Sequence, residues 1–245
     1  MLSRTVCLIA MSAIAALLGC RAPINERAPV LLFDGKGSSP GSVRALEAVM
    51  RNERIEYSKV DSRQVDEISE AQLLRHRLLI VPGGNFVEMG NGLSAPTAAK
   101  IRRAVEGGLN YLGVCAGAFI AGNSPFNGFN LTSGVRFRFY SAEDRGIHKT
   151  AVAVMDAEGR TLDHYWEDGP QLAGWGAVVA KYPDGTPAIV EGAVGNGWVI
   201  LTGIHAEADE SWRRGMDFKT PVSAGQAYAA KLIRAAVNRE QLPHF

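Results

Sequence analysis

The chain lacks two features that would point to common protein classes: it has few cysteines and no excess of either charge. Its 245 residues include 3 cysteines, and 26 Lys and Arg are balanced by 25 Asp and Glu. So few cysteines argue against a disulfide-dense scaffold, and the balanced charge without a basic stripe argues against nucleic acid as a partner. Long apolar runs are also missing, because the run over residues 6–18 is too short for a membrane-spanning helix.

The N-terminal apolar run instead has the features of a secretory signal. It follows Arg4, and Gly19 and Cys20 come directly after it. A positive charge, a short apolar core and a small residue before the cleavage point are typical of a signal peptide. Since the segment ending at Cys20 resembles a bacterial lipoprotein box, we expect residues 1–19 to be removed. The alternatives are an ordinary signal cleaved nearby and a short N-terminal anchor.

If Cys20 is lipidated, residues 20–28 form a tether that holds the protein at a membrane of the bacterial envelope, on its periplasmic or extracytoplasmic face. Removal of residues 1–19 takes away Arg4 and Cys7 and no acidic residue, which leaves 25 basic and 25 acidic side chains. With Cys20 acylated, Cys115 is then a single free thiol in an oxidising compartment. Such a thiol is either buried and inert or kept for its reactivity.

The sequence around Cys115 favours reactivity. A mostly apolar stretch, residues 109–114, leads into Gly113-Val114-Cys115-Ala116-Gly117 and then into helix-compatible residues 118–121. This is the Gly-x-nucleophile-x-Gly pattern of a strand–turn–helix elbow, with cysteine where hydrolases often carry serine. The glycines leave room for the sharp turn, and the start of a helix beside the sulfur favours the thiolate. The alternative is a small buried cysteine at a glycine-rich strand end.

Apolar segments that alternate with helical patterns predict one α/β domain over residues 29–240, with an open, mostly parallel sheet flanked by helices. Residues 134–191 have shorter alternating segments, such as 135–139, and turn residues at 156–159 and 183–185, which predict a β-hairpin insertion. We expect strands at 30–33, 55–60, 78–81, 109–114 and 198–204. We expect one helix that Ser42 caps, and further helices around 64–75, at 95–107 and at 224–239.

A second candidate pair, His205 and Glu207, follows the predicted strand 198–204. In an open parallel sheet the carboxyl ends of the strands meet at one edge, where ligands bind, so His205 is expected near Cys115. A histidine beside a cysteine activates it as a thiolate–imidazolium pair, and a carboxylate can orient the imidazole. The alternative for His205 is a hydrogen-bonded core or surface histidine.

These motifs resemble a known family. The elbow at Cys115, the strand end Pro82-Gly83-Gly84 and the strand ending in His205-Ala206-Glu207 look like a class I glutamine amidotransferase-like domain. More specifically, residues 81–84, 108–118 and 165–170 are similar to the domain at the N-terminus of biotin–protein ligases. The resemblance covers residues 29–238 and implies a flavodoxin-like fold.

The resemblance also implies roles for particular residues. Cys115 would be the nucleophile, His205 its base and Glu207 the carboxylate that orients the base. Gly83, Gly84 and the backbone N–H of Ala116 would bind the substrate and its oxyanion. The family's usual His-Pro-Glu is His-Ala-Glu here, a mild change because proline only stiffens that turn.

The chain has no biotin-ligase catalytic region, so it is not a biotin ligase by itself. A lipoprotein of the envelope has no supply of ATP, and no synthase domain that could receive ammonia is evident. Ammonia transfer is therefore the less favoured function. We predict a cysteine-dependent, amidohydrolase-like lipoprotein that acts on a small amide or peptide-like substrate. No cofactor is implied, and His148 and His164 lack metal-ligand spacing with Cys115. The alternative is a non-catalytic binding or scaffold lipoprotein that retains the fold.

Two further segments combine an aromatic residue with charged ones, residues 166–168 and 212–214. Each either borders the pocket or lies on an ordinary surface loop.

Overall fold

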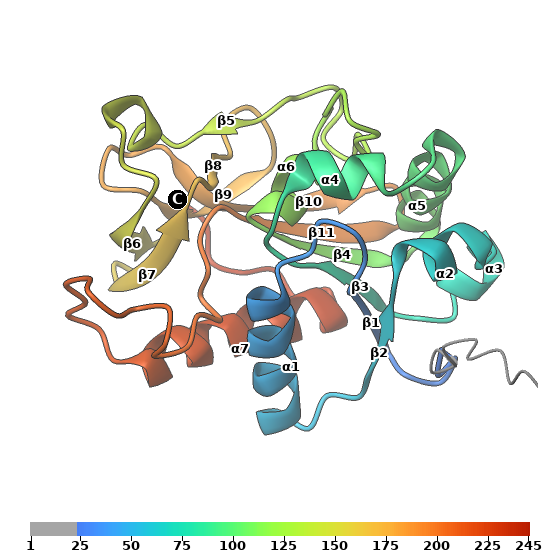
Figure 1. The fold of residues 1–245 in the computed structure, drawn as a ribbon, viewed down its shortest axis with the longest axis horizontal. Helices are drawn as coiled ribbons and strands as arrows, with labels where there is room; N and C mark the ends of the chain where they lie inside the picture. Colours follow the sequence, from blue (N-terminus) through green and yellow to red (C-terminus); the bar gives the residue numbers. More distant parts are fainter. Residues whose placement is uncertain (1–23) are drawn as a thin grey trace, which may run out of the picture.

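The computed structural model describes residues 24–245, so the expected signal peptide (1–19) and lipidation site (Cys20) lie outside the described residues. Nine strands form one open sheet with helices on both faces (Figure 1). The predicted α/β architecture is therefore confirmed. The strand order is β2-β1-β3-β4-β11-β10-β9-β6-β7, and β5 and β8 form a separate two-stranded sheet.

One half of the main sheet is parallel. Its strands β1, β3 and β4 are buried at every position, as expected when helices cover both faces. The predicted strands here are all present with small shifts at their ends. In sheet order they are β2 (Tyr57–Val60), β1 (Val30–Phe33), β3 (Leu78–Val81), β4 (Asn110–Val114) and β11 (Gly197–Thr202).

The other half is antiparallel and contains the predicted hairpins. These hairpins continue the main sheet beyond β11. Of the expected strand 135–139 only β5 (Arg138–Phe139) forms, and it pairs with β8 (Pro170–Gln171). The four antiparallel strands are β10 (Pro187–Val194), β9 (Ala177–Lys181), β6 (Lys149–Asp156) and β7 (Thr161–Glu167).

The helices form two layers, each packed on one face of the sheet (Figure 1). One face carries α1 (Pro40–Asn52) and α7 (Val222–Asn238). A short 3₁₀ helix (Glu143–Arg145) precedes β6. The opposite face carries α2 (Ser62–Glu67), α3 (Glu70–Leu73), α4 (Phe86–Asn91), α5 (Ala95–Gly107) and α6 (Ala116–Ala121).

Two helix starts differ from the sequence prediction. Helix α1 begins at Pro40 with Ser39 as its N-cap, so Ser42 lies inside the first turn and is buried. Proline at the first helical position is preorganised for this start. The single helix expected around 64–75 is two short helices, because Ile68 is extended and Ser69 begins a new capping box with Gln72.

Residues of the predicted tether (20–28) already pack against the domain, which was predicted to begin at residue 29. Ala28 is fully buried, the N–H of Asn25 donates to Ser58 Oγ at 3.0 Å, and Glu26 accepts from Gln72. At the other end, Leu242 is buried and its N–H donates to Glu191 Oε1 at 2.7 Å. Within residues 24–245, no helix has both the length and the apolar character needed to cross a membrane.

Candidate active site

Cys115 lies at the turn between β4 and α6, with a left-handed φ of 50° and ψ of −101°. A non-glycine residue in this region is strained and persists only where the surroundings hold it. A side chain at Gly113 would place its Cβ 2.6 Å from Gly117 O, and one at Gly117 would lie 2.8 Å from the carbonyl carbon of Val81. The predicted strand–turn–helix elbow is therefore present, and both glycines are needed for it.

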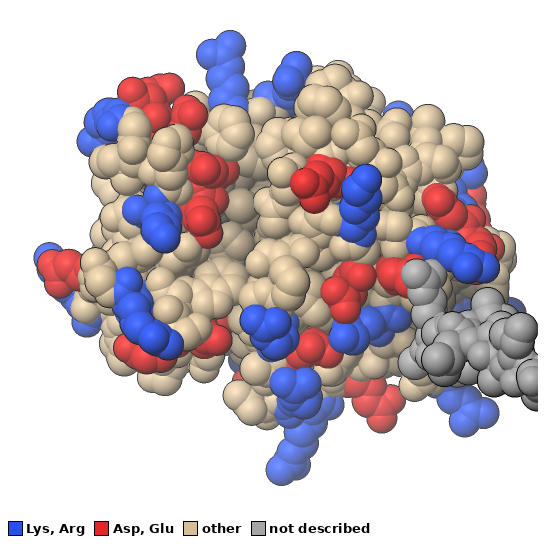
Figure 2. All heavy atoms as spheres, viewed as in Figure 1, with Lys and Arg blue, Asp and Glu red and all other residues tan. Residues whose placement is uncertain are grey.

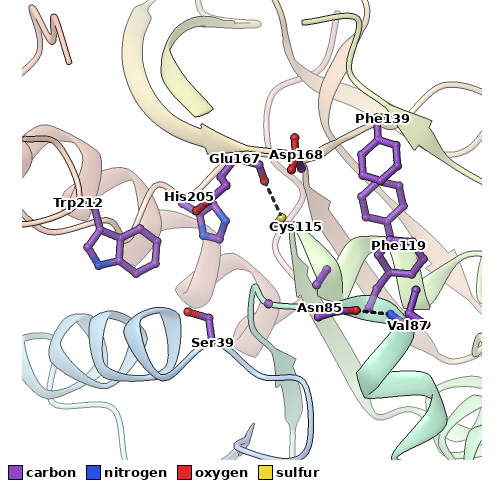
Figure 3. Close-up of a pocket in the computed structure, with 13 residues that line it drawn as sticks. Ser39, Asn85, Val87, Cys115, Phe119, Phe139, Glu167, Asp168, His205 and Trp212 are labelled. Carbon is purple, nitrogen blue, oxygen red and sulfur yellow. Dashed lines mark hydrogen bonds between the residues drawn. The ribbon is translucent and has the colours of Figure 1, made fainter. Parts of the chain in front are cut away.

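Cys115 is 5% exposed and borders a cavity of about 450 Å³ at the carboxyl ends of the parallel strands (Figure 3). Its sulfur lies 3.5 Å from the carbonyl oxygen of Glu167. Thirteen residues line the cavity: Ser39, Gly84, Asn85, Phe86, Val87, Cys115, Ala116, Phe119, Phe139, Glu167, Asp168, His205 and Trp212.

His205 follows β11 and faces this cavity beside Cys115 (Figure 3). Its N–H donates to the carbonyl of Tyr165, and its Nδ1 lies 2.8 Å from Glu207 Oε1. Burial would lower the pKa of His205, but the charges of Glu207 and Cys115 and their hydrogen bonds raise it well above the usual value. The arrangement thus favours a protonated imidazole that is oriented through Nδ1.

Glu207 has a second partner, which the sequence analysis did not identify. Ser42 Oγ donates to Glu207 Oε1 at 2.8 Å and accepts from the N–H of Gly83 at 3.1 Å. Ser42 and Glu207 are 165 residues apart in the chain. The helical sequence pattern around Ser42 gives no indication of this contact, because only the packing of α1 against the end of β11 creates it.

Of the three residues predicted to bind the substrate and its oxyanion, two line the cavity and one does not. Gly84 and Ala116 line the cavity, and their N–H groups have no acceptor among residues 24–245. Gly83 needs a correction: it does not line the cavity, and its N–H is already bound to Ser42. It lies behind His205, where an added Cβ would come 3.1 Å from the ring Nε2 and closer still to Cε1. Gly83 thus gives the imidazole its space.

Aromatic rings form two sides of the cavity. Phe119 stacks on Phe86 with ring centroids 4.7 Å apart and lies 4.9 Å from the ring of Phe139. On the other side, the ring of Trp212 lies 5.3 Å from that of His205 (Figure 3). The segment 212–214, for which two interpretations were open, thus borders the cavity through Trp212.

The mouth of the cavity is acidic. Glu167 and Asp168 line it, whereas Trp166 of the same segment is fully buried in the core. Tyr165 Oη donates to Glu167 Oε2 at 2.7 Å, and Asp168 adopts a left-handed φ of 43°. Of the lining residues that the structure describes, none is Lys or Arg. Residues 24–245 also contain no group of three or more side chains arranged to hold a metal ion.

Comparisons with known proteins agree with this fold. Residues 28–146 match the family described as biotin-protein ligase, N terminal. No protein in the curated set matches the sequence. Among solved structures, a glutamine amidotransferase aligns with a TM-score of 0.56 at 19% identity, covering 83% of this chain and 99% of that one. A cytoplasmic protein from Salmonella typhimurium aligns with a TM-score of 0.54 at 13% identity, covering 84% and 98%.

The same fold also occurs inside a larger enzyme. The GH42 β-galactosidase Gan42B of G. stearothermophilus aligns with a TM-score of 0.54 at 14% identity over 88% of this chain. The match covers only 30% of that enzyme. At such identities these structures show the fold alone. The family match confirms the resemblance of residues 28–146 to the biotin–protein ligase N-terminal domain. The segment that holds His205 and Glu207 lies outside that match.

Proposed function

We propose that this chain, with its glutamine amidotransferase-like fold, is a cysteine-dependent hydrolase that cleaves a small amide or peptide-like substrate. One observation carries the proposal. The strained, buried Cys115 shares a cavity with His205, whose Nδ1 is held 2.8 Å from Glu207. A thiol beside an oriented, proton-holding imidazole is the arrangement that nucleophilic catalysis by cysteine requires.

The chemistry takes place in two halves. The Cys115 thiolate attacks the amide carbonyl, an S–C bond forms, and the N–H groups of Gly84 and Ala116 stabilise the negative oxygen. His205 gives its proton to the departing nitrogen, and the C–N bond breaks to leave a thioester. Water, deprotonated by His205, then attacks the thioester, and the S–C bond breaks to release a carboxylate and restore the thiolate.

The charge of the cavity supports a neutral or cationic amide as the substrate. Glu167 and Asp168 line it, no described lining residue is Lys or Arg, and acidic side chains border the hollow in Figure 2. The α-carboxylate of free glutamine would find no Lys or Arg to pair with among the described lining residues. The signal-like features of residues 1–20 support an envelope location with a lipid on Cys20, where hydrolysis needs no ATP or partner synthase.

The second candidate is a non-catalytic binding lipoprotein. The position of the sulfur, 3.5 Å from the Glu167 carbonyl oxygen, favours it, since a thiol that donates to a carbonyl is in its protonated form.

The two candidates differ in how Cys115 reacts with iodoacetamide. The full chain is alkylated over a range of pH and the Cys115 peptide is quantified by mass spectrometry, for the wild type and for His205→Ala. A hydrolase gives a labelling midpoint well below about 8.5, the value for a free thiol, and His205→Ala moves it toward that value. His244→Ala, which removes an exposed histidine that contacts Glu191 and does not line the cavity, is the control and leaves the midpoint unchanged.

An ordinary midpoint in both the wild type and His205→Ala contradicts the hydrolase and favours the binding protein. A low midpoint that depends on His205 justifies a panel of neutral and cationic amides, with release of ammonia or amine as the readout.

A further inference from the structure

We propose that Ser42 is a positioning residue of this site, acting on His205 through Glu207. The inference rests on the proposed function. It adds one residue to the relay, by which we mean the hydrogen-bonded residues His205 and Glu207 behind Cys115. Ser42 lies in the first turn of α1 and is fully buried. Its neighbours on the buried face of α1 are apolar, including Val43 and Leu46. A buried hydroxyl lowers the stability of the fold unless it is hydrogen-bonded. The hydrogen-bond partners of Ser42 therefore indicate its role.

The direction of each hydrogen bond follows from the chemistry of the groups. The backbone N–H of Gly83 can only donate, so Ser42 Oγ is the acceptor in that 3.1 Å bond. The single hydroxyl proton is therefore free for the 2.8 Å bond to Glu207 Oε1. Ionised Glu207 can only accept, which matches both Ser42 Oγ and His205 Nδ1.

Two donors thus converge on one oxygen of the Glu207 carboxylate, whose side chain is 2% exposed. Because Ser42 and His205 bind the same carboxylate oxygen, the serine holds that oxygen of Glu207 in place opposite His205 Nδ1. This places the Nδ1 proton toward Glu207 and leaves Nε2 for the cavity. The relay then reads Gly83 N–H to Ser42, Ser42 to Glu207, and Glu207 to His205.

A purely structural role would have a different consequence. If Ser42 only filled space, its loss would lower the stability of the fold without changing the protonation of the Cys115–His205 pair. If Ser42 positions Glu207, loss of Ser42 makes the protonated form of His205 less stable. The Cys115 thiolate that pairs with it then becomes harder to form. The titratable groups around the pair include Glu207, Tyr165 and His164 on the side of His205. They also include Glu167 and Asp168 on the cavity wall, and Tyr182 within reach of the charge of Cys115.

The test is the pH profile of Cys115 alkylation by iodoacetamide in the full chain. Ser42→Ala is expected to raise the labelling midpoint by about one pH unit and to slow labelling at pH 7 by about tenfold, as the loss of one charge-assisted hydrogen bond implies. Ser42→Thr keeps the hydroxyl and is expected to retain the wild-type midpoint. Val43→Ala, which removes two methyl groups from the same buried face, is the control for packing damage and leaves the midpoint in place.

A double variant makes the test independent of packing. In a Glu207→Gln background the relay is already broken, so Ser42→Ala is expected to cause no further shift. The proposal is overturned if Ser42→Ala keeps the wild-type midpoint, or if its shift adds in full to that of Glu207→Gln. Should Ser42→Ala fail to fold, Ser42→Cys, which keeps the size of the side chain but has only a weak donor, is compared with Ser42→Thr on the Cys115 peptide alone, and equal midpoints overturn the proposal.

The outcomes also separate this inference from the proposed function. A low wild-type midpoint that depends on His205 but not on Ser42 leaves the hydrolase standing and removes the serine from the relay. An ordinary midpoint in the wild type itself overturns both.

Discussion

A methyl group added at Gly83 tests whether the position of the His205 ring controls Cys115. Gly83 has an ordinary φ, so Gly83→Ala introduces no backbone strain of its own. The new Cβ would lie 3.1 Å from Nε2 and 3.2 Å from Nδ1 of His205, and nearer still to Cε1. Ordinary contacts of a Cβ begin at 3.4 Å. Either the imidazole or the backbone at residue 83 has to move.

The ring is the part that moves, because the backbone of Gly83 is hydrogen-bonded at both its groups. Its N–H donates to Ser42 Oγ, and its carbonyl accepts from the N–H of Ser39. To regain van der Waals contact the imidazole retreats by about 1 Å. That displacement lengthens the 2.8 Å bond from Nδ1 to Glu207 and shifts Nε2 relative to the sulfur. A misplacement of this size costs up to about 100-fold in rate.

The assay measures both the chemistry and the fold. Gly83→Ala is expected to move the midpoint of Cys115 alkylation toward that of a free thiol and to reduce amide hydrolysis by about 10- to 100-fold. Gly107→Ala is the matched control, since its new Cβ meets only the flexible end of Leu74, at 3.3 Å, far from the site. Thermal unfolding shows whether each variant is folded. A folded Gly83→Ala protein with the wild-type midpoint and rate would refute the argument that the space behind His205 controls the site.

Two further predictions concern charge. Asp168→Asn removes a negative charge from the cavity mouth, and the repulsion of an anionic reagent by that charge is about 1 kcal/mol at a partly exposed site. The ratio of Cys115 labelling by iodoacetate to labelling by iodoacetamide is therefore expected to rise about fivefold. An unchanged ratio contradicts the acidic cavity. Burial lowers the pKa of His164 to about 4. Because unfolded His164 takes up its proton near pH 6.5, the unfolded state binds more protons between pH 6.5 and 4. Acid therefore destabilises the wild type by up to about 3 kcal/mol more than His164→Leu, as denaturant unfolding at pH 7 and pH 4.5 will show.

The parts of the fold that sequence predicts well are those with strong local patterns. Strands β1 and β3 match their predicted bounds because a short, fully apolar run has few other stable arrangements. Helix α5 also matches, since Ser94 caps it, Pro96 follows in its first turn and Gly108 ends it. The break between α2 and α3 was missed, although the capping boxes that cause it can be read from the sequence.

The candidate site was predictable only where a motif carries its own chemistry. Cys115 stands out through its glycines, and His205 and Glu207 stand out because they follow a buried strand. Ser42 and the true place of Gly83 depend on contacts between distant segments, and no local pattern encodes them. The position of Ser42 on the apolar face of an amphipathic helix indicates only that its hydroxyl needs a partner, and it does not identify Glu207 as that partner.

The register of the sheet explains why these distant residues meet. Val81 pairs with Gly113, and Val114 pairs with Thr202, so β3, β4 and β11 end side by side. The residues that follow them, Gly83, Cys115 and His205, therefore converge at one edge.

The antiparallel half completes this edge. An isolated bridge joins Tyr165 of β7 to His205, and the N–H of His205 donates to the Tyr165 carbonyl at 2.8 Å. The residues after Tyr165 bring the Glu167 carbonyl to the sulfur and both carboxylates to the cavity mouth. β7 is the last strand in the sheet order, and this bridge joins it to the loop after β11. The hairpins predicted as an insertion thus hold the backbone of His205, while Glu207 holds its ring.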